Sequence, residues 1–403
     1  MALSCAMIFA LISCSPKSND ADEASNANAQ SMTGAAVPAM LTGDWVPEDP
    51  HQIDFDNLPL VPGEHAIVSD VRNAGGTRVN QHNYLVHFDG KFWAMWSDGP
   101  GEARVAADKH RNVTPGHDRA DQRISFATSV DGLNWTDKAD IAGTPEKGFG
   151  WIARGFWVRD GKLLALASRY KAPSYAGLGL QLHAFEAELG RTINWKHLGM
   201  AFDNSLNNFP PKLLATGEWM MSRRDSLRNV YFMIGGEKGF DQWESFPIVS
   251  YKDEELAAEE PYWWTLPNGE IMSLFRDNKG SGFLYRSFSR DHGRTWSTPE
   301  RTNFPDAKSK FSGLRLKDGR YVIVSNPDPK KRDPLSIAIS DDGIVFKKMG
   351  YLVGQRKVDY PHVIEHDGHL YVAFASAKQT VEVIKIKVSD LENLEMTFRK
   401  VGH

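Results

Sequence analysis

The stretch Ser289-Arg290-Asp291-His292-Gly293-Arg294-Thr295-Trp296 decides how this chain is expected to fold. Two versions that are one residue shorter, Ser129–Trp135 and Ser340–Phe346, also follow β-rich runs. In each version we expect the aspartate to cap a tight turn between two strands. The aromatic residue at the end is expected to pack against a neighbouring unit. The pattern therefore predicts a repeated turn in an all-β protein. We expect its residues to serve the fold and to have no catalytic role.

A hairpin signal recurs six times along the chain and sets its period. In each copy a turn pair such as Asp-Gly or Asn-Gly leads into an apolar strand, and the glycines are Gly90, Gly161, Gly217, Gly269, Gly319 and Gly368. Asp-Gly and Asn-Gly favour two-residue turns because both turn positions require positive φ. A repeat of roughly fifty residues is typical of a four-stranded propeller blade. We therefore predict a seven-bladed, or alternatively six-bladed, β-propeller in which residues 45–76 and 396–401 supply the seventh blade.

The first 44 residues are expected to be a targeting signal followed by a flexible tether. Residues 2–13 are apolar but too few to span a bilayer, which is typical of a signal peptide. The run ends in Leu11-Ile12-Ser13-Cys14, which resembles the bacterial lipobox, so Cys14 is the predicted lipidation site. We predict a signal peptide at 1–13, a flexible tether at 14–44 and the propeller at 45–403. The expected location is the bacterial cell envelope, by a lipid anchor at the outer membrane or cell surface, with plain secretion as the alternative.

Composition excludes several classes of function. The chain has 47 Lys and Arg against 51 Asp and Glu, and no basic stripe, so nucleic acid is not an expected partner. Both cysteines, Cys5 and Cys14, precede the predicted propeller, which excludes a disulfide, a cysteine–zinc site or a cysteine nucleophile there. Phosphate-loop, dinucleotide and HExxH motifs are absent from the sequence, so we expect no organic cofactor. Metal content stays open, and a monomer is expected.

Blade geometry converts the repeat into a candidate site. Residues about eight before each glycine and about seven after it should meet at the mouth of a central funnel. Before the glycines these are Gln81, His82, Asn83, Arg154, Asn207, Asn208, Glu259, Glu260, Tyr262, Lys310, Asp359 and Tyr360. After them come Arg169, Arg223 or Arg224, Arg276 and Asn326. Arginines at equivalent strand ends indicate an anionic ligand held by bidentate hydrogen bonds. The alternative is a set of structural salt bridges to Glu259, Glu260 and Asp359.

An insertion in the first unit adds histidines to this funnel. From turn glycine to capping aspartate the spacing is 131 − 90 = 41 residues, whereas later units have 291 − 269 = 22 and 342 − 319 = 23. The extra residues lie near 99–122 and contain His110 and His117. Long loops on a rigid scaffold commonly carry function. Together with His82 they would place three imidazoles near the arginines.

These side chains fit two reactions on an acidic sugar. In β-elimination, Arg, Asn or Gln neutralises a uronate carboxylate, while His or Tyr removes the C5 proton and protonates the departing oxygen. In hydrolysis, two carboxylates flank the scissile bond, and Glu259, Glu260 and Asp359 are available. A sialidase instead uses a tyrosine nucleophile and an arginine triad. The substrate-binding candidates are Gln81, Asn83, Arg154, Arg169, Arg224 and Arg276.

The repeated turn resembles the Asp-box of the sialidase superfamily, although the chain lacks the Arg-Ile-Pro motif of true sialidases. The order of several further motifs resembles the seven-bladed ulvan lyases of polysaccharide lyase families 24 and 25 and the α-L-rhamnosidases of glycoside hydrolase family 145. These motifs are Arg78–Asn83, Phe92–Ser97, Asp121–Ser129, Asn207–Pro211 and Trp219–Met221, and the similarity spans about residues 45–395.

The resemblance implies a catalytic histidine at His82, a second at His117 or His110, and a tyrosine. Phe209 stands where one such tyrosine would serve, so Tyr262 or Tyr170 is considered, and Tyr262 is the predicted residue. The leading hypothesis is a lyase that cleaves a uronate-containing polysaccharide such as ulvan. The alternatives are a glycoside hydrolase acting next to a uronate, as an α-L-rhamnosidase or a sialidase-like enzyme, and a non-catalytic glycan-binding lipoprotein.

Overall fold

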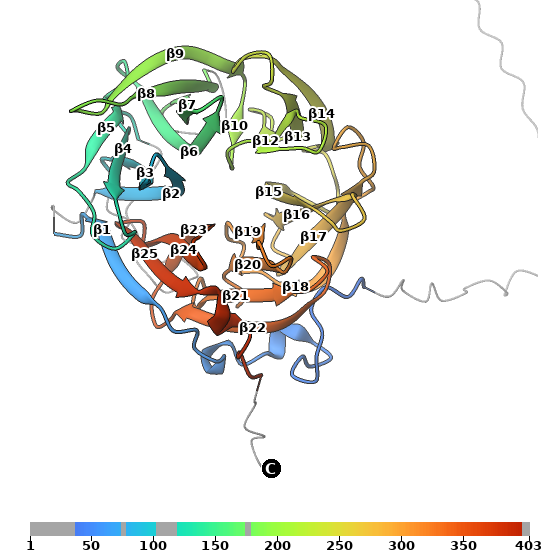
Figure 1. The fold of residues 1–403 in the computed structure, drawn as a ribbon. Helices are drawn as coiled ribbons and strands as arrows, with labels where there is room; N and C mark the ends of the chain where they lie inside the picture. The colour runs from blue at the N-terminus through green and yellow to red at the C-terminus, as the bar shows by residue number, and fades with distance from the viewer. Residues whose placement is uncertain (1–36, 74–77, 102–118, 174–178, 397–403) are drawn as a thin grey trace, which may run out of the picture. The chain divides into compact units, whose positions relative to one another are not determined.

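The computed structural model describes residues 37–73, 78–101, 119–173 and 179–396. Residues Val37–His403 form one compact unit. Its described strands form six sheets that stand around a common axis as the blades of a propeller (Figure 1). The short 3-10 helices are η1 (Pro50–Gln52), η2 (Phe55–Asn57) and η3 (Val388–Leu391). In this part of the chain no helix is long and apolar enough to cross a membrane.

Each blade is an antiparallel sheet whose first strand lies nearest the axis (Figure 1). Blade 1 consists of β2 (Val79–Phe88), β3 (Lys91–Gly99), β4 (Arg123–Ser129) and β5 (Ala139–Ala142). Blade 2 consists of β6 (Phe149–Arg159), β7 (Lys162–Lys171), β8 (Gln181–Glu188) and β9 (Asn194–Asp203). Blade 3 consists of β10 (Leu206–Asn207), β11 (Lys212–Leu213), β12 (Trp219–Arg224), β13 (Val230–Gly235) and β14 (Trp243–Val249).

The second half of the ring repeats this arrangement. Blade 4 consists of β15 (Ala258–Thr265), β16 (Ile271–Asp277), β17 (Phe283–Ser289) and β18 (Glu300–Pro305). Blade 5 consists of β19 (Ser312–Arg315), β20 (Tyr321–Ser325), β21 (Leu335–Ser340) and β22 (Phe346–Val353). Blade 6 consists of β23 (Val358–His366), β24 (His369–Ser376), β25 (Thr380–Lys387) and, from the other end of the chain, β1 (Glu64–Asp70).

The predicted hairpins form the inner pair of strands in each blade. In the first hairpin Asp89 and Gly90 both have positive φ, 50° and 68°, and Asp367 and Gly368 repeat this in the last, at 46° and 69°. Positive φ at both central residues is the geometry that twists a two-residue hairpin correctly. The Asp-Gly pairs therefore fix the register of the strands that follow them.

The ring closes with six blades, so the preferred count of seven was wrong and the alternative is confirmed. Residues of the expected seventh blade lie elsewhere. Strand β1 pairs with β25, with Glu64 opposite Lys385 and Asp70 opposite Thr380, and so becomes the outermost strand of blade 6. Leu41 and Leu60 form single bridges to β22 of blade 5. The expected C-terminal strand at 396–401 lies almost wholly outside the described residues.

The repeated turns hold adjacent blades together, as predicted. The indole of Trp296 in blade 4 lies 4.6 Å from the ring of Phe232 in blade 3, and its Nε1 donates to the Gly293 carbonyl oxygen. Two tryptophans outside the three repeated turns make the same kind of contact, because Trp195 of blade 2 packs on Trp93 of blade 1 and Trp243 of blade 3 packs on Trp157 of blade 2. The turn aromatic of one blade thus becomes core for the preceding blade.

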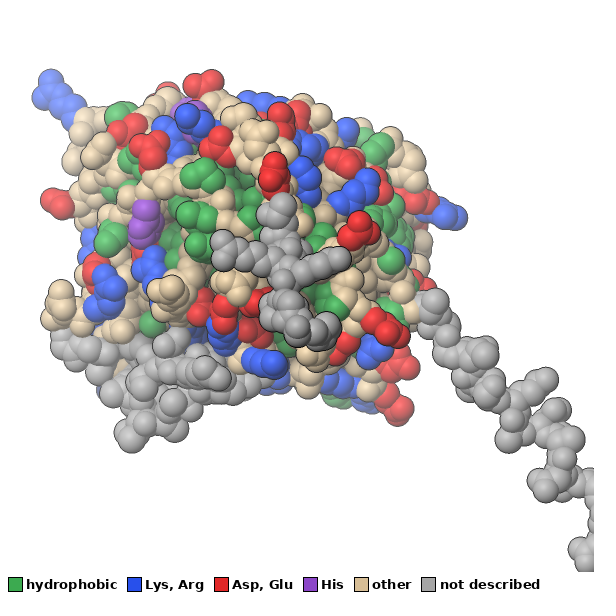
Figure 2. Space-filling model, turned by 90° about the horizontal axis from the view of Figure 1, so that it is seen from below, with side chains coloured by type: hydrophobic (Ala, Val, Ile, Leu, Met, Phe, Trp, Pro, Cys, Tyr) green, Lys and Arg blue, Asp and Glu red, His purple; other side chains and the backbone are tan. Residues whose placement is uncertain are grey.

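The outer surface carries charge of both signs. Figure 2 views the unit from the side, and on this face acidic and basic side chains are interspersed, with apolar side chains between them. Mixed charges of this kind cancel over short distances, since exposed charges are screened beyond about a Debye length of 10 Å. This face therefore presents no broad field of one sign.

A capping aspartate should contribute measurably to stability. Asp342 Oδ1 accepts hydrogen bonds from Ser340 Oγ at 2.9 Å and from the backbone N–H groups of Ile344 and Val345, both at 2.8 Å. We expect Asp342→Ala to lower the free energy of unfolding by about 1 kcal/mol, as for loss of a helix cap. The measurement is the urea midpoint at constant m value.

The neighbouring residue provides the control. Asp341 forms only an exposed ion pair with Lys347, and we expect Asp341→Ala to change stability by less than about 0.5 kcal/mol. Burial raises the pKa of Asp342, but the N–H donors outweigh it and the net pKa is lowered. Its contribution is therefore present above about pH 4 and lost as the pH falls further. Equal midpoints for the two variants at pH 7 would refute the capping role.

Candidate functional site

Four inner strands share an irregularity at the face where they begin, which we call the mouth. The ladder shifts register between Gln81 and Tyr84 in β2, Ala153 and Gly155 in β6, Glu259 and Tyr262 in β15, and Asp359 and His362 in β23. Such bulges re-aim side chains next to active sites. They place His82, Arg154, Glu260 and Tyr360 at corresponding positions around the axis.

The backbone at these bulges adopts a conformation that L residues rarely take. His82, Glu260 and Tyr360 have φ values of 57°, 51° and 57°. Pro261 and Pro361 follow two of them, and proline suits a place where a ladder hydrogen bond is missing. Positive φ in a residue other than glycine costs on the order of 1–3 kcal/mol and is concentrated at functional sites. Because three residues around one axis share this strained conformation, we infer that the mouth is a functional site.

Three arginines at the mouth each hold a carboxylate. Arg276 Nη1 donates to Glu260 Oε2 at 2.7 Å, and Arg224 forms an ion pair with Glu259. Arg332 Nη1 donates to Asp359 Oδ1 at 2.5 Å, and its Nη2 donates to the Lys308 carbonyl oxygen at 2.7 Å. All three carboxylates are at most 8% exposed. Buried ion pairs of this kind cost much desolvation, so their geometry must satisfy both partners.

Nearby positive charges keep two of the buried carboxylates, Glu260 and Asp359, ionised. Burial alone raises the pKa of Glu260, but Arg276, Lys310 and Arg332 outweigh it, so the net pKa is lowered. Asp359 follows the same balance, with Arg332 as the main opposing charge. Asp306 differs, because burial raises its pKa to about 7 against the effect of Arg276 and Arg332. The mouth therefore contains both ionised carboxylates and one carboxyl group that titrates near neutrality.

Arg154 stands apart from the other arginines. It is 2% exposed, and among the described residues it forms no ion pair with a carboxylate. The charge of Arg154 and its side-chain hydrogen bond to Tyr84 both act to lower the pKa of Tyr84, although burial raises that pKa overall. Its Nε, both amide atoms of Asn83 and Nδ2 of Asn208 are buried without a hydrogen-bond partner in this part of the chain. Buried donors without partners are costly, so these groups are suited to receiving a ligand.

His82 and Tyr360 meet across the gap between blades 1 and 6. Their ring centroids are 4.4 Å apart with the planes tilted by 51°. His82 Nδ1 lies 3.2 Å from Ser97 Oγ, which accepts a hydrogen bond from the Ala153 N–H at 2.9 Å. Burial, followed by the Glu260 charge, raises the pKa of Tyr360. The phenol is therefore neutral and lies in the field of an ionised carboxylate.

Below the mouth, side chains from three blades close the centre of the ring. Tyr84 Oη donates to the Asn208 carbonyl oxygen at 2.7 Å, and Lys310 Nζ donates to Tyr84 Oη at 2.8 Å. The ammonium also lies over the rings of Tyr84 and Phe209, at 4.2 and 4.4 Å. Burial lowers the pKa of Lys310 to about 7, although Glu260 opposes the shift. We call Tyr84, Asn208, Phe209 and Lys310 the floor.

The structure brings most of the predicted residues together at the mouth. His82, Arg154 and Arg276 lie there, Gln81 and Asn83 flank His82, and Arg224 joins through Glu259. Two predicted residues occupy different surroundings, Arg169 and Tyr262. Arg169 pairs with Glu146 and donates to Gln181 Oε1 at the end of β7. Tyr262 is buried against Phe209, with ring centroids 4.6 Å apart, and hydrogen bonds to Ser312 and Gly313.

Other predicted residues are not described, and some residues of the site were missed. His110, His117 and Cys14 lie outside the described residues. Tyr360 was placed at the funnel from the sequence but was not selected as the site tyrosine. Its spacing is the signal, since it precedes Gly368 by eight residues as His82 precedes Gly90. Arg332 and Asp306 lie in loops of irregular length, where the repeat gives no position.

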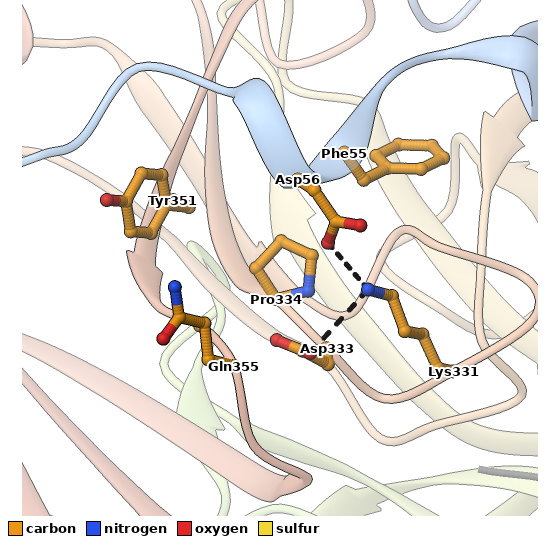
Figure 3. A pocket seen from close by; sticks show the side chains of 8 residues that line it. Phe55, Asp56, Lys331, Asp333, Pro334, Tyr351 and Gln355 are labelled. Carbon is orange, nitrogen blue, oxygen red and sulfur yellow. Dashed lines mark hydrogen bonds and ion pairs between the residues drawn. The ribbon is translucent and has the colours of Figure 1, made fainter. Parts of the chain in front are cut away.

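The molecule also has pockets away from the propeller axis. A pocket of about 650 Å³ borders the N-terminal segment at η2 and is shown in Figure 3. Lys331 points between Asp56 and Asp333 there, with N–O distances of 2.5 and 3.6 Å. These charges satisfy one another and attach η2 to blade 5. Among the described residues no group of three or more His, Cys, Asp or Glu is placed to hold a metal ion.

Comparisons with solved structures place the fold among sialidase-type propellers. A sialidase superposes with a TM-score of 0.57 at 18% identity, over 87% of this chain and 35% of its own. A Trypanosoma rangeli sialidase in complex with 2,3-difluorosialic acid gives 0.62 at 14% identity, over 83% of this chain and 60% of its own. A Dyadobacter fermentans protein of unknown function gives 0.61 at 14% identity, over 80% and 98%.

These likenesses establish the architecture, and the chain spans about a third and three fifths of the two sialidases. The resemblance to ulvan lyases and family 145 rhamnosidases stays a prediction, and the six-bladed ring differs from the seven-bladed lyases. No curated protein matches the sequence. The model of the BNR repeat-like domain matches residues 111–372, which is more than half of the chain. The chain therefore belongs to the BNR repeat-like domain family.

Proposed function

We propose that this protein is an enzyme that cleaves a glycan at an acidic sugar, and that the reaction is hydrolysis. The observation that carries the proposal is the grouping of Tyr360, Glu260 and Arg276 at the mouth. Tyr360 is neutral and sits in a strained bulge, while Arg276 helps to keep Glu260 ionised, and the Glu260 charge acts on the Tyr360 phenol. A hydroxyl nucleophile next to a general base is the arrangement that covalent catalysis requires.

In the proposed reaction, Glu260 accepts the phenol proton as Tyr360 Oη attacks the anomeric carbon. A Tyr–sugar bond forms, the glycosidic bond breaks, and the departing oxygen takes a proton from an acid at the mouth. The predicted histidines of the insertion, His110 and His117, are candidates for that acid. Water then attacks the anomeric carbon and gives one proton to the deprotonated acid, the Tyr–sugar bond breaks, and the proton held by Glu260 returns to the phenol. The Trypanosoma rangeli sialidase, which is named as a covalent intermediate with its ligand, has the same fold.

Acidic sugars are the proposed substrates because of Arg154. Each of the other three arginines at the mouth is matched by a carboxylate, whereas Arg154 has no carboxylate partner within the described part of the chain. A guanidinium with nearby amide donors suits a carboxylate better than a neutral hydroxyl group. We also propose that lipidation at Cys14 tethers the enzyme to the cell envelope, where it meets polymers that cannot enter the cell intact.

The contact between His82 and Tyr360 favours β-elimination as a second candidate. Their 4.4 Å ring separation would let one remove the C5 proton of a uronate while the other protonates the departing oxygen. An arginine would neutralise the carboxylate, as ulvan lyase activity requires. The products separate the candidates, because elimination creates a C4–C5 double bond that absorbs ultraviolet light and hydrolysis does not.

The first test is activity on ulvan, polygalacturonate, polysialic acid and the 4-methylumbelliferyl glycosides of glucuronic and N-acetylneuraminic acid. We expect new reducing ends or released fluorophore without a rise in ultraviolet absorbance. Tyr360→Phe should lower kcat/KM by about a thousandfold or more, because the nucleophile is lost. A rise in absorbance that depends on His82 would replace hydrolysis with elimination.

The control for the missing hydroxyl is Tyr321→Phe. Tyr321 Oη donates to the Thr265 carbonyl oxygen at 2.9 Å, next to the hairpin turns on the opposite face. We expect this variant to keep kcat/KM within about twofold of wild type. Full activity of Tyr360→Phe would eliminate Tyr360 as the nucleophile.

The acid limb of the pH profile should report Glu260. A general base must be ionised, so kcat/KM should fall only as the pH drops below the ordinary glutamate range, because the pKa of Glu260 is lowered. Arg276→Gln removes the main opposing charge, and the limb should move to higher pH by about one unit or more. The midpoint is the readout, since overall activity will also fall. An unshifted limb would show that Glu260 does not control it.

Arg154 should select for the sugar carboxylate. We expect Arg154→Met to weaken binding of glucuronate or N-acetylneuraminate by about tenfold or more, since a charged hydrogen-bond pair is lost. Binding of the corresponding methyl esters should change little. Isothermal titration measures both, with Arg294→Met as the control, because Arg294 pairs with Glu218 away from the mouth. Equal losses for acid and ester would contradict the assignment.

A further inference from the structure

A small pocket adjoins the mouth between blades 3 and 4. It measures about 230 Å³ and is lined by Leu227, Arg228, Ser250, Tyr251, Ala257, Ala258, Glu259 and Asn278. Three segments form its walls, namely the loop between β12 and β13, the connection from β14 into β15, and the start of the loop after β16. All three lie at the mouth, because β12 and β16 end there and β15 begins there. The volume is smaller than a drug-sized site and fits one ring-sized group.

The lining has the mixed character that a pyranose ring requires. Leu227 is 61% exposed and Tyr251 is 51% exposed, so two large apolar side chains face solvent in one pocket. An aromatic ring with a polar tip can cover the apolar face of a sugar while the hydroxyl groups reach polar partners. Asn278 Oδ1 is buried and has no hydrogen-bond partner among the described residues. It is available to accept a hydrogen bond from a sugar hydroxyl.

The walls are braced before any ligand binds. The Tyr251 N–H donates to Asn229 Oδ1 at 3.0 Å, and the Asn229 side chain and N–H both donate to Asp225 at 2.8 Å. On the other wall, the Asn278 N–H donates to the Ala257 carbonyl oxygen at 2.9 Å. Loops held in this way lose little freedom on binding, which favours affinity.

Glu259 connects this pocket to the proposed catalytic residues at the mouth. It lines the pocket, forms the ion pair with Arg224, and directly precedes the proposed base Glu260. The pocket therefore shares Glu259 with the network of ion pairs at the mouth, and a glycan chain with its acidic sugar at Tyr360 and Arg154 could place a further unit there. We infer that this pocket is a second sugar subsite, which binds the pyranose next to the acidic sugar; this inference rests on the proposed function.

The inference predicts a difference between long and short ligands. We expect Tyr251→Ala to weaken binding of the preferred polymer among ulvan, polygalacturonate and polysialic acid by about tenfold, or about 1.4 kcal/mol. Hydrolysis of the 4-methylumbelliferyl glycosides, which carry no second sugar, should stay within about twofold. Tyr251→Phe keeps the ring and should restore most of the polymer affinity. Affinity electrophoresis measures binding without turnover.

Leucine variants give a matched control on the same blade. Leu227→Ser should weaken polymer binding as well, whereas Leu213→Ser should not, because Leu213 is 58% exposed but lies in β11 near the hairpin turns. Unchanged polymer binding by Tyr251→Ala would overturn the subsite, and so would a wild-type protein that cleaves the small glycosides but binds none of the three polymers. Tyr251-dependent binding without cleavage would keep the subsite and refute the proposed function.

Discussion

The pairing of β1 with β25 is the constraint on which the rest of this structure depends. These strands come from opposite ends of the propeller sequence, and their antiparallel ladder makes the last blade complete. Only a closed ring brings six inner strands around one axis. The bulges at His82, Arg154, Glu260 and Tyr360 lie on four different blades, more than 270 residues apart at the extremes. The candidate site therefore exists only when the first and last strands have met.

The mouth is an arrangement of compensated charges with one exception. Burying an arginine or a carboxylate alone costs several kcal/mol, and pairing recovers this only with good geometry. Arg224, Arg276 and Arg332 are matched by Glu259, Glu260 and Asp359. The first and last of these pairs join adjacent blades, and the charges of Arg276 and Arg332 lower the pKa values of Glu260 and Asp359. Arg154 is the cation in this group without such a carboxylate among the described residues. The proposed specificity for an acidic ligand and the ionisation of the proposed base would thus depend on different arginines.

The repeat made the fold predictable, because turn pairs and capping aspartates act locally. Asp89-Gly90 and Asp342 form the predicted turns. The blade count could not be read in the same way, since it depends on which strand β1 pairs with. At the site, the spacing from each turn glycine correctly located His82, Arg154 and Glu260. It could not rank Tyr360 above Tyr262, because Tyr360 lies within the bulge of β23, whereas Tyr262 lies just after the bulge of β15 and packs against Phe209. Loop residues such as Arg332 have no fixed spacing.

The floor has a consequence for how a polymer meets this protein. Tyr84, Phe209 and Lys310 are 0%, 4% and 1% exposed, and the hydrogen bonds from Lys310 to Tyr84 and from Tyr84 to Asn208 cross the axis from blade 5 to blade 3. These side chains fill the centre of the ring, so a polymer cannot pass through it from one face to the other. Under the proposed function, substrate would enter and product would leave by one opening, so a bound polymer would either present its end or bend across the mouth.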